Sequence, residues 1–265
     1  MTEAAYFAKW LTPYQPEQPT LVCLHGFTGT GATWQSLAWP ATVNVLAVDL
    51  IGHGRSPVFV HPTRYRMAQV VAELQALLAA KQIPAYHLLG YSMGARVALA
   101  WALADPHVVS VILESGRPGL ADPTQRLARQ QQDNALAAKL LTAPLVEFVN
   151  DWEKLPLFAS QRALPAAVQA RVRAERLSQQ PFGLAMSLMM MGTGQQPNYW
   201  PQLAQLPPGL LLVGEQDAKF QRLNLAMQAQ APQLDYQVLP GGHCVHLEHP
   251  TEFLAAVITW LKQYA

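Results

Sequence analysis

A serine between two glycines has the setting in this sequence that most strongly predicts chemistry. Ser92 is the centre of Gly90-Tyr91-Ser92-Met93-Gly94. The apolar residues 85–89 before it are typical of a buried strand, and residues 97–103 after it are good helix formers. A tight strand-to-helix turn holds its serine in a strained conformation and lifts the hydroxyl above the sheet, and bulkier residues at the flanking glycines would clash. The G-x-S-x-G pattern also occurs by chance, but this setting favours a nucleophile elbow.

Two further groups must activate such a serine. Its hydroxyl is a poor nucleophile or base unless a histidine takes the proton and a carboxylate holds that histidine. Behind an elbow of this kind the order along the chain is serine, acid, histidine. Asp217 follows the apolar run 210–213, and His243 follows the run 236–239 and a Pro-Gly-Gly turn. We therefore predict a triad of Ser92, Asp217 and His243, with Glu215 as the alternative acid.

Negative charge that develops on a carbonyl oxygen needs hydrogen-bond donors fixed in advance, and loss of one costs about 3 to 4 kcal/mol of transition-state stabilisation. Two backbone N–H groups are placed to form this oxyanion hole. One belongs to Met93, directly after the serine, and the other to Phe27 in the loop after the strand 20–24.

The other histidines near these motifs favour structural roles. His243, His246 and His249 follow a His-x-x-His-x-x-His spacing that could suggest zinc. His249 precedes a proline, and the segment has no H-E-x-x-H arrangement, so we predict no metal. We expect His246 and His249 at a helix entry or on the surface. We expect His53 to make structural hydrogen bonds in its glycine-rich turn.

Short apolar runs alternate with helical segments along most of the chain. Runs that are apolar on both faces require helices on both sides of a mainly parallel, doubly wound sheet, which together with the motifs above predicts an α/β-hydrolase fold. The predicted strands are residues 20–24, 43–48, 86–89, 108–113, 210–213 and 236–239, and the predicted covering helices are residues 65–82, 92–105, 220–230 and 251–264.

The alternation stops over residues 117–206, here called the lid segment. Gln, Arg, Ala and Leu dominate it, prolines interrupt short helical windows, and no strand-like run occurs. We predict a helical lid inserted over the carboxyl edge of the sheet, with residues 1–116 and 207–265 forming the α/β core. The methionines at 189–191 are expected to be adaptable packing.

Charge is distributed unevenly between these parts. The lid segment has nine basic and six acidic residues, a net +3, and the rest of the chain has nine basic and eleven acidic residues, a net −2. Because guanidinium groups match carboxylates, a positive lid suggests an anionic substrate, although a solvated helical surface is the simpler explanation for any single arginine.

Composition narrows the class of protein. The chain has 265 residues, 51% of them hydrophobic and 13% charged, with a formal net charge of +1, which gives no basic field for nucleic acid. The first residues show no secretory leader, and no apolar run reaches the roughly 20 residues that span a bilayer. Cys23 and Cys244 are expected to be free thiols. We expect a cytoplasmic monomer without membrane insertion.

The chain resembles the 2-succinyl-6-hydroxy-2,4-cyclohexadiene-1-carboxylate (SHCHC) synthases of menaquinone biosynthesis over nearly its whole length. The specific matches lie in the lid segment, and residues 176–199 match poorly. Ala95 departs from the family, which often has a second glycine there, and removes no catalytic group. The matching segments are residues 25–29 with Trp34, 90–96, 116–120 with 125, 126 and 129, 148–152, 157–160, 214–220 and 242–243.

The resemblance implies a lyase that needs no metal or organic cofactor. In it, serine acts as the base that takes a ring proton from 2-succinyl-5-enolpyruvyl-6-hydroxy-3-cyclohexene-1-carboxylate, and pyruvate is eliminated. The resemblance implies that Arg96, Arg129 and Arg173 bind substrate carboxylates, with a structural role for Arg96 as the alternative. The residues that it implies shape the pocket are Tyr91, Trp152 and Phe158.

Two other functions remain open from the sequence. A carboxylesterase, thioesterase or C–C hydrolase would use the same triad with an acylated Ser92, but apolar esters favour apolar lids. A non-catalytic binding protein of this fold would have no need for three reactive groups in the required order.

Overall fold

The computed structural model describes residues 6–264, so the first residues, for which we expected no secretory leader, lie outside the described residues apart from Tyr6. Within that range seven strands form one sheet in the order β1-β3-β2-β4-β5-β6-β7. All neighbouring pairs are parallel except β1 with β3. The strands are β1 (Ala8–Trp10), β2 (Thr20–Leu24), β3 (Asn44–Val48), β4 (Tyr86–Tyr91), β5 (Val108–Glu114), β6 (Gly209–Gly214) and β7 (Leu234–Leu239).

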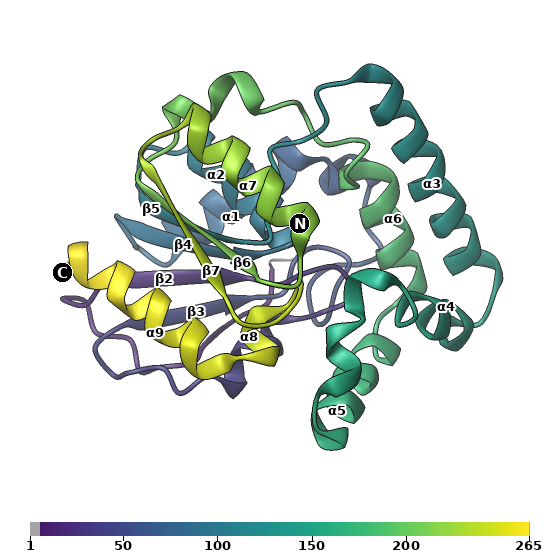
Figure 1. Ribbon diagram of the computed structural model, residues 1–265, viewed down its shortest axis with the longest axis horizontal. Coiled ribbons are helices and arrows are strands. Elements are labelled where there is room, and N and C mark those ends of the chain that lie inside the picture. The colour runs from purple at the N-terminus through teal and green to yellow at the C-terminus, as the bar shows by residue number, and fades with distance from the viewer. Residues whose placement is uncertain (1–5, 265) are drawn as a thin grey trace.

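Both faces of the sheet are covered, as the apolar runs predicted. In β2, Val22 and Leu24 belong to one buried cluster with α1 and α2, whereas Leu21 and Cys23 belong to a second cluster with α9. Figure 1 shows α1, α2 and α7 on one side of the sheet and α8 and α9 on the other. These helices are α1 (Met67–Ala80), α2 (Met93–Ala104), α7 (Ala218–Gln230), α8 (Val245–Glu248) and α9 (Pro250–Leu261).

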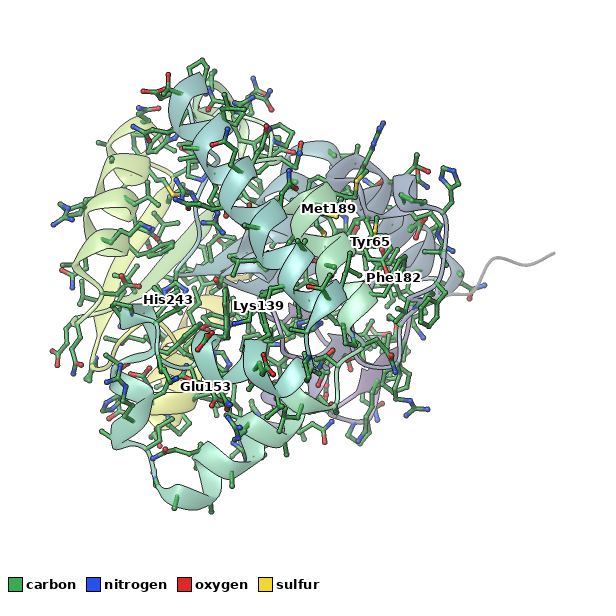
Figure 2. All side chains as sticks on the ribbon, turned by 90° about the vertical axis from the view of Figure 1, so that its right-hand side faces the viewer. Tyr65, Lys139, Glu153, Phe182, Met189 and His243 are labelled. Carbon is green, nitrogen blue, oxygen red and sulfur yellow. The ribbon has the colours of Figure 1, made fainter. Side chains whose placement is uncertain are left out.

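The lid segment lies between β5 and β6 and is helical throughout its regular structure. Figure 1 places its helices to one side of the sheet, and Figure 2 views them from that side. The helix α6 is also part of the core, because Met186 and the fully buried Met191 pack in the same cluster as α2, while Met189 is 37% exposed. The lid helices are α3 (Pro123–Thr142), α4 (Leu145–Trp152), α5 (Ala166–Leu177) and α6 (Pro181–Met191), with short 3₁₀ turns at Pro156–Phe158, Ser160–Ala163 and Trp200–Gln205.

The predicted strands and covering helices are confirmed, with ends that move by one to three residues. The short edge strand β1 was missed, since three residues are too few to show a pattern. The helix expected from residue 65 begins at Met67, after a 3₁₀ turn over Pro62–Tyr65. Cys23 and Cys244 are both buried and free. Within residues 6–264, no helix is both long and apolar enough to cross a membrane.

Candidate active site

The elbow around Ser92 has the strained geometry that its glycines predicted. Strand β4 ends at Tyr91, helix α2 begins at Met93, and Ser92 between them has φ +51°. A Cβ at Gly90 would lie 2.4 Å from the Gly94 carbonyl oxygen, and one at Gly94 would lie 2.1 Å from that of Leu24. No real Cβ contact is that short, so both positions require glycine if the serine is to stand above the sheet.

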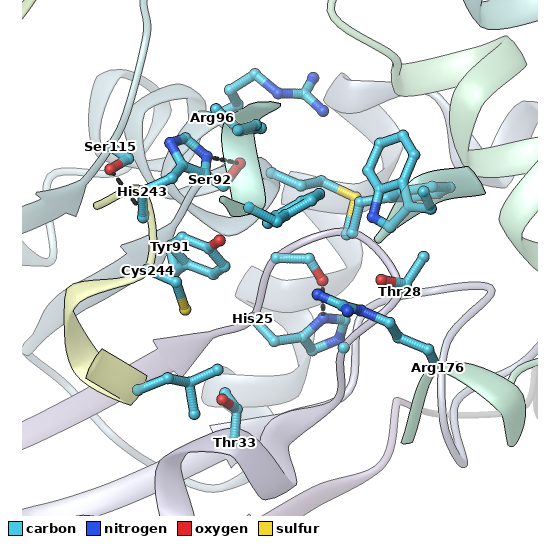
Figure 3. Close-up of a pocket in the computed structure, with 18 of the residues that line it drawn as sticks. His25, Thr28, Thr33, Tyr91, Ser92, Arg96, Ser115, Arg176, His243 and Cys244 are labelled. Atoms are coloured by element: carbon cyan, nitrogen blue, oxygen red, sulfur yellow. Dashed lines mark hydrogen bonds between the residues drawn. The ribbon is translucent and has the colours of Figure 1, made fainter. Parts of the chain in front are cut away.

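Ser92, His243 and Asp217 form one hydrogen-bonded chain. His243 Nε2 lies 3.1 Å from Ser92 Oγ, and His243 Nδ1 lies 2.6 Å from Asp217 Oδ2 (Figure 3 draws the first contact). Asp217 is also the N-cap of α7 and accepts the N–H of Phe220, whereas Glu215 is exposed. Because the carboxylate holds the proton on Nδ1, Nε2 is left as the acceptor for the serine proton. The residues are thus arranged for base or nucleophilic chemistry at Ser92.

Phe27 and Met93 both line the pocket above Ser92. Met93 is the first residue of α2, so its N–H has no acceptor within the helix, and the positive end of the helix dipole favours an anion there. Phe27 lies in the loop that follows β2. Their placement suits the predicted oxyanion hole.

One end of the pocket concentrates positive charge. Arg96, Arg117, Arg129 and Lys219 line it together. Arg96 Nη1 donates to the Met191 carbonyl at 2.6 Å. Burial, with repulsion from neighbouring arginines, lowers the pKa of Arg96 to about 9 and that of Arg117 to about 10. Arg96 and Arg117 therefore remain charged at neutral pH, at a cost that a bound anion would relieve.

Arg129 and Arg117 differ in how they are held. Arg129 Nε donates to the buried carboxylate of Asp133 at 2.8 Å, which fixes the guanidinium and leaves its other nitrogens free. Within the described part of the chain, Arg117 Nε is buried without a hydrogen-bond partner. An unpaired buried guanidinium edge in a pocket is a ready site for a carboxylate.

The expectation for Arg173 is corrected by the structure. Its guanidinium turns away from the pocket, to Glu153 Oε2 at 2.5 Å and Asn150 Oδ1 at 2.6 Å. Arg176 lines the pocket instead. Residues 172, 175 and 176 of α5 share the face toward the pocket, and residue 173 lies about 100° around the helix from 172.

Aromatic side chains form a wall between the core and the lid segment. Trp152 lies edge-on to Phe27 with ring centroids 5.3 Å apart, and the Trp152 and Phe158 centroids are 5.7 Å apart. The centroids of the Tyr91 and His243 rings are 5.6 Å apart. Trp152, Phe158 and Tyr91 thus line the pocket at the places expected of shaping residues.

The three histidines of the His-x-x-His-x-x-His spacing face different carboxylates. Besides the His243–Asp217 contact, His246 Nδ1 lies 2.7 Å from Glu114 Oε2, and His249 lies 3.9 Å from the exposed Glu252. His246 lies in the first turn of α8, at a helix entry as one of the two expected alternatives had it, and not on the surface, because its side chain is 1% exposed. The Glu114 carboxylate makes burial of the His246 ring possible, because it pairs with the ring nitrogen.

A metal cluster is the alternative interpretation of this region. One potential ligand atom from each of Glu114, Cys244 and His246 lies within 4.8 Å of the others. The 2.7 Å contact between Glu114 and His246 has hydrogen-bond length, however, and two ligands of one tetrahedral zinc stand about 3.3 Å apart or more. The cluster therefore fits a hydrogen-bonded pair better than an ion.

His53 has the structural role expected of it. The side chain is fully buried, and its Nδ1 contacts the Ile51 carbonyl oxygen at 3.0 Å within the same turn. Burial and the neighbouring His25 lower the pKa of His53 to about 3, so the ring is neutral at pH 7 and a weak base.

Sequence reasoning missed Arg117, Arg176 and Lys219 as pocket residues. Arg117 comes three residues after β5 and Lys219 comes two after Asp217, so both follow strands at the carboxyl edge, and that rule could have found them. Arg176 had no such signal, because which side of a lid helix faces the pocket depends on tertiary packing.

A strained serine elbow, a histidine–aspartate pair and a helical insertion between β5 and β6 of this sheet are features of the α/β-hydrolase class. Residues 21–257 match the alpha/beta hydrolase family. The SHCHC synthase of Pectobacterium atrosepticum is 35% identical over 255 residues, which cover 93% of this chain and 95% of that protein. The solved structure of MenH from S. aureus superposes with a TM-score of 0.92 at 35% identity, covering 99% of both chains.

The same fold also serves other chemistry. A thermophilic esterase from Thermogutta terrifontis aligns with a TM-score of 0.82 at 25% identity over 97% of this chain and 93% of the esterase. The greater identity lies with the synthases, and the chain belongs to the SHCHC synthase family within the α/β hydrolases.

Proposed function

We propose that this protein is a lyase of menaquinone biosynthesis that converts 2-succinyl-5-enolpyruvyl-6-hydroxy-3-cyclohexene-1-carboxylate to SHCHC and pyruvate. The observation that carries the proposal is the charge of the pocket above Ser92. Apart from the histidines, five cationic side chains and one carboxylate, Glu175, line it. A substrate with three carboxylates matches this surplus, and relatives that bear the synthase name support the assignment.

In the proposed reaction Ser92 is a base. Its oxygen takes the ring proton next to the succinyl carbonyl while its own proton passes to His243 Nε2, and Asp217 stabilises the imidazolium that forms. The electron pair of the broken C–H bond moves into an enolate, whose oxygen accepts hydrogen bonds from Phe27 and Met93 N–H.

Collapse of the enolate then forms a C2=C3 double bond, shifts the existing C3=C4 double bond of the ring to C4=C5, and breaks the C5–O bond to the enolpyruvyl group. The departing oxygen takes up a proton, which His243 can return, and enolpyruvate becomes pyruvate. Arg96, Arg117 and Arg129 hold carboxylates at one end of the pocket, and Trp152 and Phe158 exclude water beside the ring. Each step is a proton transfer or an elimination that residues of this chain can assist, so the proposal includes no cofactor or metal.

The competing function is an esterase in which Ser92 is acylated. The same triad serves it, and the Thermogutta structure shares its fold. An apolar ester would, however, leave Arg117 Nε buried without a partner among the described residues, which is costly. The pocket therefore favours an anionic substrate over a simple ester.

We further infer that residues 117–206 act as the lid over this site and that one chain suffices for activity, so that the protein acts as a cytoplasmic monomer. Every residue of the proposed machinery comes from the same chain. The arginines of the lid segment and Ser92 of the core would contact different parts of the same bound substrate.

The test measures pyruvate release from substrate generated enzymatically in the same cuvette, next to hydrolysis of a series of p-nitrophenyl esters. We expect fast release of pyruvate and slow ester cleavage. Fast ester cleavage without pyruvate would overturn the proposal in favour of the hydrolase.

A further inference from the structure

A second histidine–carboxylate pair lies beside the triad and is not used by it. Glu114, the last residue of β5, is 0% exposed, and His246 in α8 is 1% exposed. Glu114 Oε2 faces His246 Nδ1 at 2.7 Å, and Glu114 Oε1 accepts the backbone N–H of His246 at 3.1 Å. Two contacts thus fix the imidazole to the end of the strand, only three residues after the catalytic His243.

The groups around His246 determine its charge. Within residues 6–264, Glu114 makes no ion pair with a lysine or arginine, so His246 is its counter-ion. Burial alone lowers the pKa of His246, but Cys244 and the Glu114 carboxylate outweigh it and raise the pKa to about 10. Since burial raises the pKa of the Cys244 thiol, Glu114 is the negative partner on which we rely.

The remaining neighbours also suit a cation. The ring of Trp34 lies 4.4 Å from that of His246, and the rings of Tyr91 and Phe253 lie 4.9 Å and 5.7 Å away. Glu175 of the lid segment is a further charged group that interacts with it, and its carboxylate favours an imidazolium. His246 is therefore an imidazolium at neutral pH, and both of its ring nitrogens carry protons.

This charge fixes the direction of the next hydrogen bond. His246 Nε2 lies 2.9 Å from the hydroxyl oxygen of Thr33, which lines the pocket. A neutral ring with its proton on Nδ1 would accept the hydroxyl proton at Nε2. An imidazolium instead donates from Nε2, so the threonine oxygen accepts and the proton of the hydroxyl points elsewhere.

We propose that the buried Glu114–His246 pair makes Thr33 a hydrogen-bond donor into the pocket, where its hydroxyl binds a substrate carboxylate at the end away from Arg96. Figure 3 shows Thr33 and Arg96 at opposite ends of the pocket. For the identity of the substrate this inference rests on the proposed function. Thr33 is then a specificity-determining residue, and Glu114 and His246 are positioning residues.

The first test compares Thr33→Val, which keeps the shape and loses the hydroxyl, with Thr33→Ser, which keeps the hydroxyl. A hydrogen bond to a charged group contributes about 1.5 to 3 kcal/mol, so Thr33→Val is expected to raise KM for pyruvate release about 10- to 100-fold. Thr33→Ser should stay within about threefold of wild type. Thr251→Val, at an exposed site on α9, is the matched control and should leave KM unchanged.

The second test asks whether Glu114 acts through Thr33. Glu114→Gln removes the negative partner, so the His246 ring becomes neutral. Its Nε2 then accepts a hydrogen bond from the Thr33 hydroxyl, which no longer donates into the pocket. Its effect on KM should therefore largely disappear in a Thr33→Val background, which a double-mutant cycle measures. ¹⁵N NMR of the His246 ring reads the charge directly, with both nitrogens protonated at pH 7 in wild type and one in Glu114→Gln.

A binding measurement separates this inference from the proposed reaction. Calorimetry with 2-(3-carboxypropanoyl)benzoate, an aromatic dicarboxylate with a succinyl chain, needs no turnover. If wild type releases no pyruvate yet Thr33→Val alone weakens this probe, the reaction is wrong and the donor role stands. Unchanged KM and unchanged probe affinity in Thr33→Val, or a neutral His246 ring in wild type, overturn the inference.

Discussion

Replacement of Arg117 by glutamine is expected to make the protein more stable and a poorer binder of substrate. In the structure, burial and the neighbouring Arg129 lower the pKa of Arg117 from 12.5 to about 10. That difference corresponds to about 3 kcal/mol against the charged side chain in the folded state. The unpaired buried Nε explains why nothing within the described chain offsets it.

The direction of the expected stability change follows from the lowered pKa of Arg117, which is a basic group. Below about pH 10 the guanidinium is charged in both the folded and the unfolded state, so the full penalty is present at neutral pH, and it is relieved only between about pH 10 and 12.5. Glutamine removes the charge but must itself be partly buried. We therefore expect a gain of about 1 to 3 kcal/mol at pH 7, or several degrees in Tm.

The assay is thermal unfolding with and without the succinyl dicarboxylate probe, together with KM for pyruvate release. Arg117→Gln should raise the Tm of the free protein, reduce the further rise that the probe gives, and raise KM at least tenfold. Arg171→Gln, the same change at an exposed position of α5, should leave the Tm, the rise in Tm that the probe gives and KM unchanged. A lower Tm in Arg117→Gln, or an unchanged KM, would refute the idea that a bound anion relieves this charge.

Three other changes test the site. Ser92→Ala should lower kcat for pyruvate release by roughly a thousandfold or more while the probe still binds, and near-normal turnover would exclude the serine as base. Gly94→Ala should unfold the protein or disorder the elbow, because its Cβ would lie 2.1 Å from the Leu24 carbonyl oxygen, as circular dichroism and Tm would report. Asp133→Asn should loosen Arg129 and raise KM about fivefold, since the arginine side chain is 32% exposed and its ion pair is partly screened; a larger loss in kcat than in KM would contradict a positioning role.

Much of the fold and the core of the site follow from local patterns. The strands that end at the active edge are apolar on both faces, and Ser92, Asp217 and His243 each follow one of them, so topology alone brings them to one edge. Gly90 is equally local, because it responds to the Gly94 and Ala95 backbone one turn away, whereas Gly94 faces Leu24 of the neighbouring strand β2.

The parts that were missed depend on tertiary packing. The Glu114–His246 pair joins residues that are 132 positions apart, and no pattern in the sequence links one to the other. Arg173 and Arg176 are both basic residues of one helix and both pair with Glu153, and only the rotation of that helix decides that Arg176 also lines the pocket.

The attachment of α6 to the core limits how the lid segment can open. Met186 and Met191 pack in the main cluster, the Met191 carbonyl accepts Arg96, and a Cβ at Gly183 would lie 2.2 Å from the Gly52 carbonyl oxygen. Because α6 cannot move without breaking these core contacts, its amide protons should exchange with deuterium as slowly as those of α2. We therefore expect residues 145–177, from α4 to α5, to move for substrate entry and pyruvate exit, and their amides to exchange quickly until an anion binds.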